Sequence, residues 1–565
     1  MSENRFWLTS YDDGLTDLDP SLWETSFIDA IKPVFTEFKY KTALAYMGTE
    51  INFGMLDRYS NSFAQMLISN GFQKGDIIGI NLPNMPEYII SWLGILKAGC
   101  VVSGVSPLLS DEEMLHQLKD SNAKGLVTLD AIFAARLINI EGELPDLKLV
   151  VTASIGGFLP FYKRIPGKLL GKIPKGKVTN LVGKIVIKMN KVIKSGAYVS
   201  EQPSVSVSPD DIAYVQYTGG TTGPPKGAML THRSIIADHV IVQKWLKWKK
   251  GEGIALSGFP FFHIAGLFFN ANCIYLGCTQ VLIPNPRDTG HICKELDKYK
   301  PEYLVNVPTL YQMLIADPAF SELDHSAVKS CICSASPFPP ESQRELEKIV
   351  GKGVLLEVYG MTETSPLTAM NPVDKEKKLG TIGLPLPNTD IILKDPGTGQ
   401  EVAQGEPGEI CVKGPQVMKG YYNKPEETEA CFDDDGYFHT GDVAVQDAAG
   451  YLKIVDRTKD MIIVSGFKVF SKKVEEIMTE HPAVDMIATI GIENPERPGS
   501  ELVKAYITTP PGYMKDKDID ALKIDIRDFA KDKLAAYEVP KIIEIMDEMP
   551  LTTVGKIDKK VLRKM

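Results

Sequence analysis

The sequence predicts an α/β protein, with a large N-terminal domain of parallel-type sheets covered by helices and a small α+β domain after it. Three observations lead to this class. A chain of 565 residues is too long for one hydrophobic core, so two or more domains are expected. Residues 1–455 alternate short apolar runs with amphipathic stretches, the succession expected for strands and helices of parallel sheets. The residues after 455 contain a second, shorter succession of predicted strands and helices.

The N-terminal elements follow from apolar runs bounded by turn residues. Residues 76–81 predict a strand, residues 85–98 a helix and residues 100–105 a second strand, and this order implies parallel pairing. Another strand is expected at 212–217. From about residue 380 to 452 the chain is rich in turns, with Gly-Glu-Pro-Gly and Asp-Asp-Asp-Gly runs, which predicts a small β-barrel-like region.

The charged segment Asp-Arg-Thr-Lys-Asp at 456–460 separates two β-like stretches, and we place the domain boundary there. This divides the chain into residues 1–455, the connecting segment 456–460, and residues 461–565. The last part predicts a small α+β unit, with a helix near 472–481, strands near 486–491 and 502–508, and a helix over 519–533.

The composition narrows the function classes. With 44% hydrophobic residues, 24% charged residues and a net charge of −10, it is ordinary for a globular protein and argues against general nucleic-acid binding. The eight cysteines include no Cys-x-x-Cys pair, so we expect neither a metal cluster nor disulfides, and a cytoplasmic location without a secretory leader. Residues 253–286 carry no formal charge, but Asn, Gln, His and Pro interrupt the run, which favours buried core over a membrane span.

A basic insertion is expected at about 154–204. Residues 154–200 contain ten Lys or Arg and no Asp or Glu, which leaves about −20 for the rest of the chain (−10 minus +10). Apolar residues recur at helical spacing over 181–193, with lysines on another face. Such a basic amphipathic helix can lie on an anionic membrane surface, so peripheral membrane contact is one interpretation. The other is a solvated insertion whose apolar face packs on its own protein.

A Gly- and Thr-rich loop follows the expected strand at 212–217. It reads Tyr-Thr-Gly-Gly-Thr-Thr-Gly-Pro-Pro-Lys-Gly over 217–227. Glycines let backbone N–H groups converge on an anion, threonine hydroxyls add donors, and the lysine adds a positive charge. Two prolines precede the lysine, so the loop is not an ordinary P-loop. A polyphosphate site and a flexible surface turn both fit this composition. The candidate binding residues are Thr218, Gly219, Gly220, Thr221, Thr222, Gly223 and Lys226.

Four further segments carry candidate site residues. Residues 358–364 (Val-Tyr-Gly-Met-Thr-Glu-Thr) place an aromatic ring, a hydroxyl and a carboxylate close together. Residues 439–442 (His-Thr-Gly-Asp) put an aspartate at a turn, and Arg457 follows fifteen residues later. Residues 551–558 (Leu-Thr-Thr-Val-Gly-Lys-Ile-Asp) contain Lys556. Each segment alone is weak, because turns, exposed acids and terminal lysines are common on surfaces.

Together and in this order, the five motifs resemble the adenylate-forming superfamily of acyl-CoA synthetases, firefly luciferases and peptide-synthetase adenylation domains. The resemblance spans nearly the whole chain, from about residue 96 to Lys556. The Thr-Gly-Gly-Thr-Thr-Gly variant and the insertion before it are similar to those of long-chain fatty-acyl-CoA synthetases. The resemblance implies a ligase that forms a carbon–sulfur bond. Such an enzyme joins a carboxylate to AMP with release of pyrophosphate and then passes the acyl group to coenzyme A, using ATP, Mg²⁺ and coenzyme A.

The resemblance also assigns roles to residues of this chain. The loop over 218–226 would cradle the β- and γ-phosphates. The other implied residues act on the nucleotide, the metal ion or the substrate carboxylate. They are Thr362 (α-phosphate), Glu363 (Mg²⁺), Tyr359 and Gly360 (adenine), Ser336 (near the adenine and acyl pocket), Asp442 and Arg457 (ribose), His263 (substrate carboxylate) and Lys556 (adenylation, bridging carboxylate and phosphate oxygens).

Members of this superfamily carry out their two half-reactions by rotating the small C-terminal domain, which is therefore expected to be mobile. Lys459 matches the hinge position, and Gly466 would line the tunnel for the pantetheine arm of coenzyme A; a plain turn glycine is the alternative at Gly466. The sequence departs from the family pattern at Ser334 and Ala335, where many relatives have glycine, so the pocket wall gains bulk. Residues 466–471 also differ from the common pattern.

The expected substrate is a hydrophobic monocarboxylate. Residues 259–269 are strongly apolar and, by position in the family, would line the acyl pocket, although core packing alone explains most of this composition. We find no basic residue placed to meet a second carboxylate. A medium- to long-chain fatty acid is the first interpretation, an aryl or alicyclic acid the second, and an acyl-AMP ligase that loads a carrier protein the third. A non-catalytic binding protein is disfavoured because Lys556 and Glu363 are both present.

Overall fold

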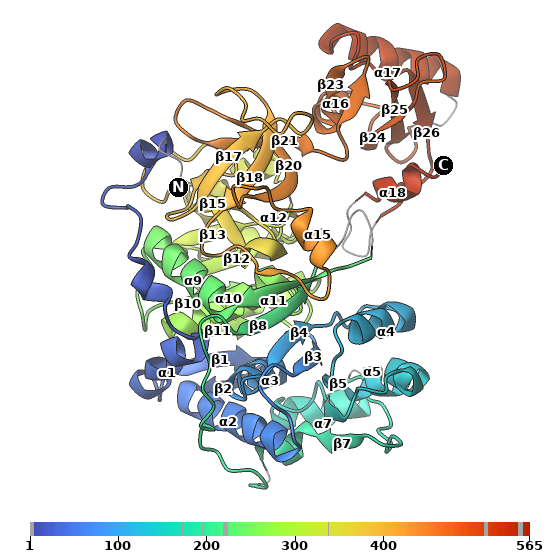
Figure 1. Cartoon of the computed structure of the whole chain (residues 1–565). Coiled ribbons are helices and arrows are strands. Elements are labelled where there is room, and N and C mark those ends of the chain that lie inside the picture. Colours follow the sequence, from blue (N-terminus) through green and yellow to red (C-terminus); the bar gives the residue numbers. More distant parts are fainter. Residues whose placement is uncertain are drawn as a thin grey trace. The chain divides into compact units, whose positions relative to one another are not determined.

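The computed structural model of the protein describes residues 5–171, 173–194, 196–218, 224–336, 338–513, 518–551 and 557–565. The chain divides into two compact units (Figure 1). The first holds the chain up to Asp390 together with Lys413–Gly436, and the second holds Ile391–Val412 together with Tyr437–Met565. Each unit is described by itself.

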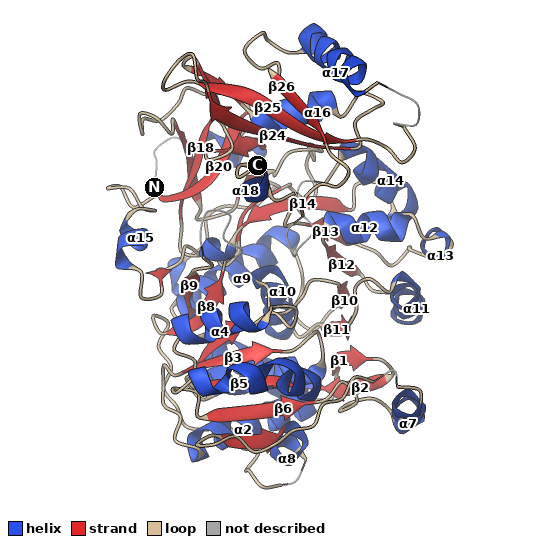
Figure 2. Cartoon of the chain, turned by 90° about the vertical axis from the view of Figure 1, so that its right-hand side faces the viewer, coloured by secondary structure: helices blue, strands red, loops and turns tan. Residues whose placement is uncertain are grey.

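Two large mixed sheets form the frame of the first unit (Figures 1 and 2). Within the described residues one has nine strands and the other eight. The first runs in the order β16 (Leu384–Pro385), β15 (Leu367–Met370), β14 (Leu355–Gly360), β13 (Ser330–Cys333), β12 (Tyr303–Asn306), β10 (Ile254–Ser257), β11 (Thr279–Leu282), β1 (Thr42–Tyr46) and β2 (Thr49–Asn52). The second runs β19 (Gly420–Tyr421), β9 (Gly227–Thr231), β8 (Ile212–Tyr217), β4 (Val101–Gly104), β3 (Ile77–Asn81), β5 (Gly125–Leu129), β6 (Leu149–Ala153) and β7 (Ile185–Lys188).

The inner strands of both sheets are parallel, and the strands near every edge except β7 are antiparallel. In the nine-stranded sheet the parallel pairs run from β14 to β1, and in the eight-stranded sheet from β8 to β7. Strands β3, β5 and β6 are buried along their whole length, as expected when helices cover both faces of a parallel sheet. Their continuous apolar runs, rather than an alternating pattern, follow from that double coverage.

A layer of helices links the two sheets. α3 (Pro86–Lys97) contacts β3 and β4, α9 (His232–Leu246) contacts β9, and α10 (Ile264–Leu276) contacts β10 and β11. α1 (Phe27–Glu37) contacts both α9 and α10, and α2 (Phe53–Ser69) contacts α1 and α3. Every residue of α3 is buried. The other helices of the unit are α4 (Asp111–Asp120), α5 (Asp130–Ile132), α6 (Ile138–Ile140), α7 (Phe161–Leu169), α8 (Met189–Ile193), α11 (Thr289–Tyr299), α12 (Pro308–Ile315), α13 (Pro318–Ser321), α14 (Pro340–Val350) and α15 (Pro425–Glu429).

The second unit contains three smaller sheets. A four-stranded sheet has the order β17 (Asp390–Lys394), β18 (Gly408–Lys413), β20 (Phe438–Gln446) and β21 (Leu452–Arg457). A hairpin is formed by β22 (Ile462–Val464) and β23 (Phe467–Val469), and a three-stranded sheet by β24 (Met486–Glu493), β25 (Glu501–Thr508) and β26 (Ile542–Ile545). The apolar faces of α16 (Ser471–Met478) and α17 (Ile519–Lys533) pack on the last sheet, and α18 (Lys559–Leu562) follows near the C-terminus.

The fold class predicted from the sequence is confirmed. The expected strand–helix–strand series at 76–105 is β3, α3 and β4, with β3 and β4 parallel, and the expected helix at 519–533 is α17. The turn-rich region at 380–452 supplies β17, β18 and β20 of the four-stranded sheet. The division at 456–460 stays a prediction. Contacts group that sheet with the C-terminal residues, and β21 runs through Arg457.

The helix predicted over 181–193 is wrong. Residues 185–188 form the edge strand β7, parallel to β6, and only 189–193 are helical. The β-branched run Ile-Val-Ile fits a pleated edge, and pairing with β6 overrides the helical spacing. Met189, Val192 and Ile193 are buried, so this part of the basic insertion packs on its own protein. Within the described residues, no helix is both long and apolar enough to cross a bilayer.

Candidate functional site

The base of the Gly- and Thr-rich loop is an antiparallel hairpin formed by β8 and β9. The N–H of Thr218 donates to the carbonyl of Lys226 at 2.9 Å, which closes the loop. Below it, the hydroxyl of Tyr217 donates to Asp120 at 2.7 Å, and Lys424 pairs with the same carboxylate at 3.3 Å. The predicted phosphate ligands Gly219, Gly220, Thr221, Thr222 and Gly223 lie outside the described residues. Thr218 and Lys226 hold the two ends of the loop together.

Tyr421 joins two predicted site residues. It lies in β19, the edge strand that pairs antiparallel with β9. Its hydroxyl donates to Oε1 of Glu363 at 2.8 Å, and the ammonium of Lys226 lies 4.6 Å from the centre of its ring. Burial, and next the charge of Glu363, raise the pKa of the Tyr421 hydroxyl well above its usual value, so the hydroxyl remains a donor. The loop lysine and the candidate metal carboxylate therefore meet on the same side chain.

The end of β14 leads directly into the candidate adenine and α-phosphate residues. Tyr359 and Gly360 close the strand, and the 3₁₀ turn Thr362–Thr364 follows. Gly360 is required by a close approach, because a Cβ there would lie 1.8 Å from the carbonyl oxygen of Pro366. Tyr359 and Thr362 are buried. The backbone carbonyl of Glu363 accepts from the N–H of Met418 at 2.7 Å, which fixes the turn against the segment that leads into β19.

Ser336 lies in the loop after β13, which faces the end of β14. Ser334 in this loop donates through Oγ to the carbonyl of Val358 at 3.4 Å. Ala335 has φ +76°, in the left-handed region that favours glycine. The sequence resemblance has glycine in this stretch, so the chain keeps the backbone conformation of a glycine while it carries a methyl group. Pro337 lies outside the described residues.

His263 caps the start of α10 at the end of a tightly held loop. Its Nδ1 accepts from the N–H of Ala265 at 3.3 Å, and its side chain is exposed. The loop before it is anchored at both ends. Asn84 donates to the carbonyl of Phe259 at 2.8 Å, and Gln216, on β8, donates to the carbonyl of Phe262 at 2.7 Å. The predicted acyl-pocket segment is thus tied to the strand that leads into the phosphate loop.

In the second unit, Asp442 and Arg457 face each other across β20 and β21. They are register partners, and Nε of Arg457 lies 2.9 Å from Oδ1 of Asp442. Asp442 is buried, whereas the Arg457 side chain is partly exposed. The N–H of Asp442 donates to Oγ1 of Thr440 at 3.1 Å. The pairing predicted from the resemblance, with the arginine beside the aspartate, is present in the structure.

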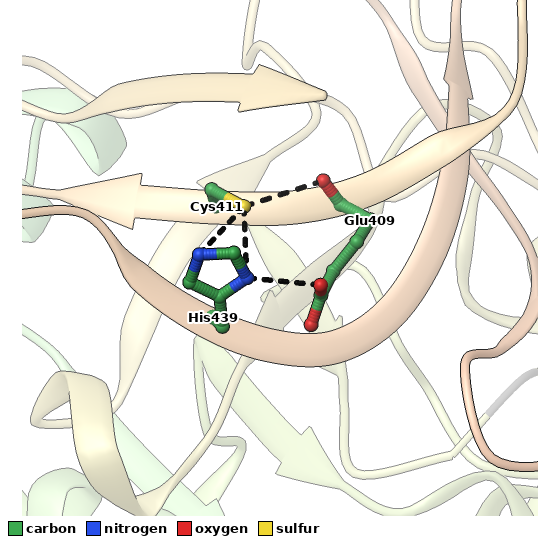
Figure 3. A group of neighbouring side chains, drawn as sticks. All are labelled: Glu409, Cys411 and His439. Carbon is green, nitrogen blue, oxygen red and sulfur yellow. Dashed lines mark hydrogen bonds and ion pairs between the residues drawn. The ribbon is translucent and has the colours of Figure 1, made fainter. Parts of the chain in front are cut away.

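A hydrogen-bonded group holds the turn that presents Asp442 (Figure 3). One oxygen of Glu409 accepts from the N–H of Gly441 at 2.9 Å, and the other lies 2.9 Å from Nδ1 of His439. The Cys411 sulfur is 3.6 Å from the same Nδ1, and Cys411 and His439 are register partners of β18 and β20. A carboxylate, a thiol and an imidazole are donors that Zn²⁺ accepts, and their ligand atoms lie within 4.8 Å of one another. Because both carboxylate oxygens already serve the turn, we interpret the group as its support.

Lys459, the predicted hinge residue, is half-buried beside other positive charges. Burial, opposed by Asp460, lowers the pKa of its ammonium to about 8, and Arg457, Arg563 and Lys560 lower it further. The guanidinium of Arg563 donates to the Lys459 carbonyl at 3.1 Å and pairs with Asp460 at 2.5 Å. Arg563, seven residues after the predicted catalytic Lys556, is therefore bound to the hinge segment, while Lys556 itself lies outside the described residues.

Gly466 lies at the turn between β22 and β23. Its φ is +85° and that of Ser465 is +50°, the combination of a type I′ hairpin turn. This geometry accounts for the glycine without reference to a ligand. Its predicted role toward coenzyme A stays a prediction.

Sequence reasoning missed Tyr421, Glu409 and Arg563. Tyr421 stands in a Gly-Tyr-Tyr-Asn run that resembles an ordinary turn, and only the pairing of β19 with β9 brings it to Lys226 and Glu363. Glu409 likewise acts through a strand pair. No local signal in the sequence marks either residue.

The comparisons with known proteins cover almost the whole chain. Residues 34–422 match the family described as AMP-binding enzyme, and residues 473–556 match the AMP-binding enzyme C-terminal domain. The chain is 36% identical over 571 residues to a long-chain-fatty-acid–CoA ligase of Bacillus subtilis, which covers 99% of this chain and 97% of that protein. It is 35% identical over 564 residues to an enzyme of the same name from Escherichia coli O6:H1, covering 99% and 98%. Among solved structures, ATP-bound MatB from Rhodopseudomonas palustris aligns with a TM-score of 0.80 at 25% identity, covering 96% of this chain and 99% of that one.

Proposed function

This chain belongs to the family of AMP-binding enzymes, and on that premise we propose that it activates long-chain fatty acids as coenzyme A thioesters. The observation that carries the proposal is the agreement of seven relatives. All are named long-chain-fatty-acid–CoA ligases, are 34–36% identical to this chain, and align over 99% of it and 97–98% of their own length.

The reaction has two steps. The fatty-acid carboxylate attacks the α-phosphorus of ATP, the bond to pyrophosphate breaks, and acyl-AMP forms. The thiol of coenzyme A then loses its proton and attacks the acyl carbon, and the bond to AMP breaks. The first step brings two anions together, so neutralising their charge is the main task of the protein.

Lys226 and Glu363 are suited to that task. Lys226 closes the Gly- and Thr-rich loop, where its ammonium would meet the β- and γ-phosphates together with Thr218. Glu363 fits a ligand of Mg²⁺, because it offers carboxylate oxygen in a partly exposed position and Tyr421 orients it through Oε1. Mg²⁺ held there would reduce the negative charge of the phosphates. Thr362, next in the chain, would donate to the α-phosphate.

The resemblance assigns nucleoside contacts to four residues of this chain. Tyr359, with Gly360, would stack on adenine near Ser336. Asp442, oriented by Arg457 and by the turn that Glu409 supports, would accept from the ribose hydroxyls. Each assignment rests on the family resemblance together with the local geometry of the side chain.

The residues near the fatty-acid substrate and coenzyme A are also assigned from the resemblance and the local geometry. His263, exposed at the start of α10 beside an apolar segment, would lie near the substrate carboxylate. Lys556 would bridge carboxylate and phosphate oxygens during adenylation. Rotation about Lys459 would then bring Gly466 toward the pantetheine arm of coenzyme A. The contacts of Arg563 with the hinge segment mean that a rotation there would carry the C-terminal residues with it.

The test is acyl-CoA formation from ATP, Mg²⁺ and coenzyme A with a series of acids from acetate to stearate, plus benzoate and cyclohexane carboxylate. Activity that peaks among the C12–C18 acids supports the proposal, and Lys556→Ala should lose adenylation by about 10²-fold or more. Highest activity with benzoate or cyclohexane carboxylate would instead indicate an aryl or alicyclic acid as the substrate. Pyrophosphate release without an acyl-CoA product would instead indicate a carrier-protein acceptor.

We also propose that the enzyme contacts membranes peripherally through residues 154–200. The positive charge of this segment in an otherwise acidic chain supports the proposal. A long-chain fatty acid partitions into bilayers, so an enzyme held at the surface meets its substrate there.

A further inference from the structure

Helix α7, Phe161–Leu169, exposes an apolar stripe to solvent. Phe161, Ile165 and Leu169 are spaced four residues apart, so they lie on one side of the helix. Their exposed fractions are 70%, 56% and 82%. Tyr162 lies beside the stripe, and Leu170 follows the last turn; both are exposed. Large apolar side chains gathered in this way on a surface mark a site that binds another apolar surface.

The opposite side of α7 is fixed to the protein. Lys163 donates from its ammonium to the carbonyl of Met47 at 2.9 Å. Ile173, which is buried, lies under the helix against Gly167, where an added Cβ would come within 2.9 Å of it. Figure 2 shows α7 at the margin of the first unit, beyond β2. The helix is therefore held with its apolar stripe turned outward.

The segment of the chain that contains α7 is positively charged. Within 154–200 the sequence has ten Lys or Arg and no acid, against about −20 for the rest of the chain. One of these lysines, Lys184, is paired with Glu141 at 3.3 Å. Among those that follow α7 most closely in the chain, Lys175 and Lys177 are exposed. The partner of this face must combine an apolar interior with negative charge.

These properties favour an anionic bilayer over a second copy of the chain. A two-fold dimer through α7 would place one basic segment against another, and like charges across an interface oppose association. A bilayer with anionic lipids instead offers a negative surface above hydrocarbon. Each lysine near such a surface strengthens binding by about fivefold. An amphipathic helix with an apolar stripe and basic residues beside it is the usual form of an interfacial anchor.

We propose that α7 inserts Phe161, Ile165 and Leu169 into the headgroup boundary of an anionic bilayer while the neighbouring lysines contact the lipid phosphates. This specifies the peripheral contact put forward under the proposed function and rests on it for its biological purpose. The docking itself needs no catalysis. It assigns the contact to α7 and not to residues 181–193.

The experiment is flotation of the full chain with vesicles of phosphatidylcholine alone or with 30% phosphatidylglycerol. The wild type should bind the anionic vesicles at least tenfold more tightly, and less so when the salt is raised from 50 to 500 mM. The triple variant Phe161→Ser, Ile165→Ser, Leu169→Ser should lose at least tenfold in binding. The matched control is Tyr40→Ser with Leu108→Ser, two large apolar side chains that are 85% and 71% exposed elsewhere in the first unit and should leave binding unchanged.

A second measurement reports insertion directly. In Phe161→Trp, brominated lipids should quench tryptophan fluorescence beyond the wild-type level, which comes from the five native tryptophans. Equal binding to both vesicle types, or wild-type binding by the triple variant, would overturn the proposal. So would absence of extra quenching. Acyl-CoA formation in detergent by the same preparations is read separately, so failure of the docking and failure of the enzymatic proposal are distinguishable.

Discussion

Removing the hydroxyl of Tyr421 tests whether this side chain couples Lys226 and Glu363 in binding Mg²⁺ and ATP. Tyr421→Phe keeps the ring beside Lys226 and deletes the 2.8 Å hydrogen bond to Glu363. A hydrogen bond to a charged group contributes about 1.5–3 kcal/mol, which corresponds to about 10- to 150-fold in an equilibrium constant. Because the bond orients the carboxylate proposed to hold Mg²⁺, the Mg²⁺ concentration for half-maximal rate should rise by about that factor.

The ring contributes separately through Lys226. Tyr421→Leu removes both contacts, and a cation–π contact of about 0.5–2 kcal/mol adds a further loss of about 2- to 30-fold. This second loss should fall on KM for ATP, since Lys226 is proposed to meet the phosphates. The two variants therefore separate the metal effect from the phosphate effect.

The assay is initial pyrophosphate release at saturating fatty acid, with Mg²⁺ titrated at fixed ATP and ATP titrated at fixed Mg²⁺. Tyr422→Phe, the adjacent tyrosine, is the matched control, and thermal unfolding checks that each variant is folded. In a Glu363→Gln background, Tyr421→Phe should have little further effect on the Mg²⁺ dependence. The reasoning is refuted if folded Tyr421→Phe keeps the wild-type Mg²⁺ dependence and kcat within twofold.

Three further predictions concern buried polar groups. Burial raises the pKa of Glu87 from 4.5 to about 8. Between these pH values the folded state keeps a proton that the unfolded chain loses, so wild-type stability falls as the pH rises from 4.5 to about 8. Glu87→Gln should gain stability relative to wild type from pH 5 to 8 in urea unfolding, and a constant difference would contradict this. Burial lowers the pKa of Lys459 from 10.5 to about 8, so the unfolded chain binds the extra proton and wild-type stability should rise above pH 8 relative to Lys459→Met. Parallel urea midpoints at pH 7.5 and 9.5 would exclude this shift. Glu409→Gln should lose about 1–3 kcal/mol of stability and raise KM for ATP, unlike the exposed control Glu406→Gln; equal behaviour of the two would remove the role given to Glu409.

Much of the fold was predictable because its elements have strong local patterns. The continuous apolar runs of β3 and β4 and the periodicity of α17 mark these elements within a residue or two. β26, a four-residue strand, was missed because a run that short carries little periodic signal. The region 181–193 was assigned wrongly because pairing with β6 decides its conformation, and that partner lies more than thirty residues earlier. Local spacing cannot report such a partner.

The candidate site also contains some residues that could be predicted from the sequence and some that could not. Asp442 and Arg457 could be paired from the resemblance, and their ion pair is present. Tyr421 could not be found, since its role depends on a strand pairing between residues almost two hundred positions apart. The apolar stripe of α7 was also missed. The helical spacing of Phe161, Ile165 and Leu169 is visible in the sequence, but whether that side faces core or solvent is decided only by packing.

The strand order of the two large sheets also sets when this protein can fold during its synthesis. β1, at residues 42–46, has its parallel partner in β11, at residues 279–282, and β9 has an edge partner in β19, at residues 420–421. At roughly 5–20 residues per second, β1 leaves the ribosome on the order of ten seconds or more before β11 exists. A nascent chain must therefore shield these apolar strands for that interval. Rapid translation of the middle third, or a chaperone bound near the N-terminus, should raise the yield of folded enzyme.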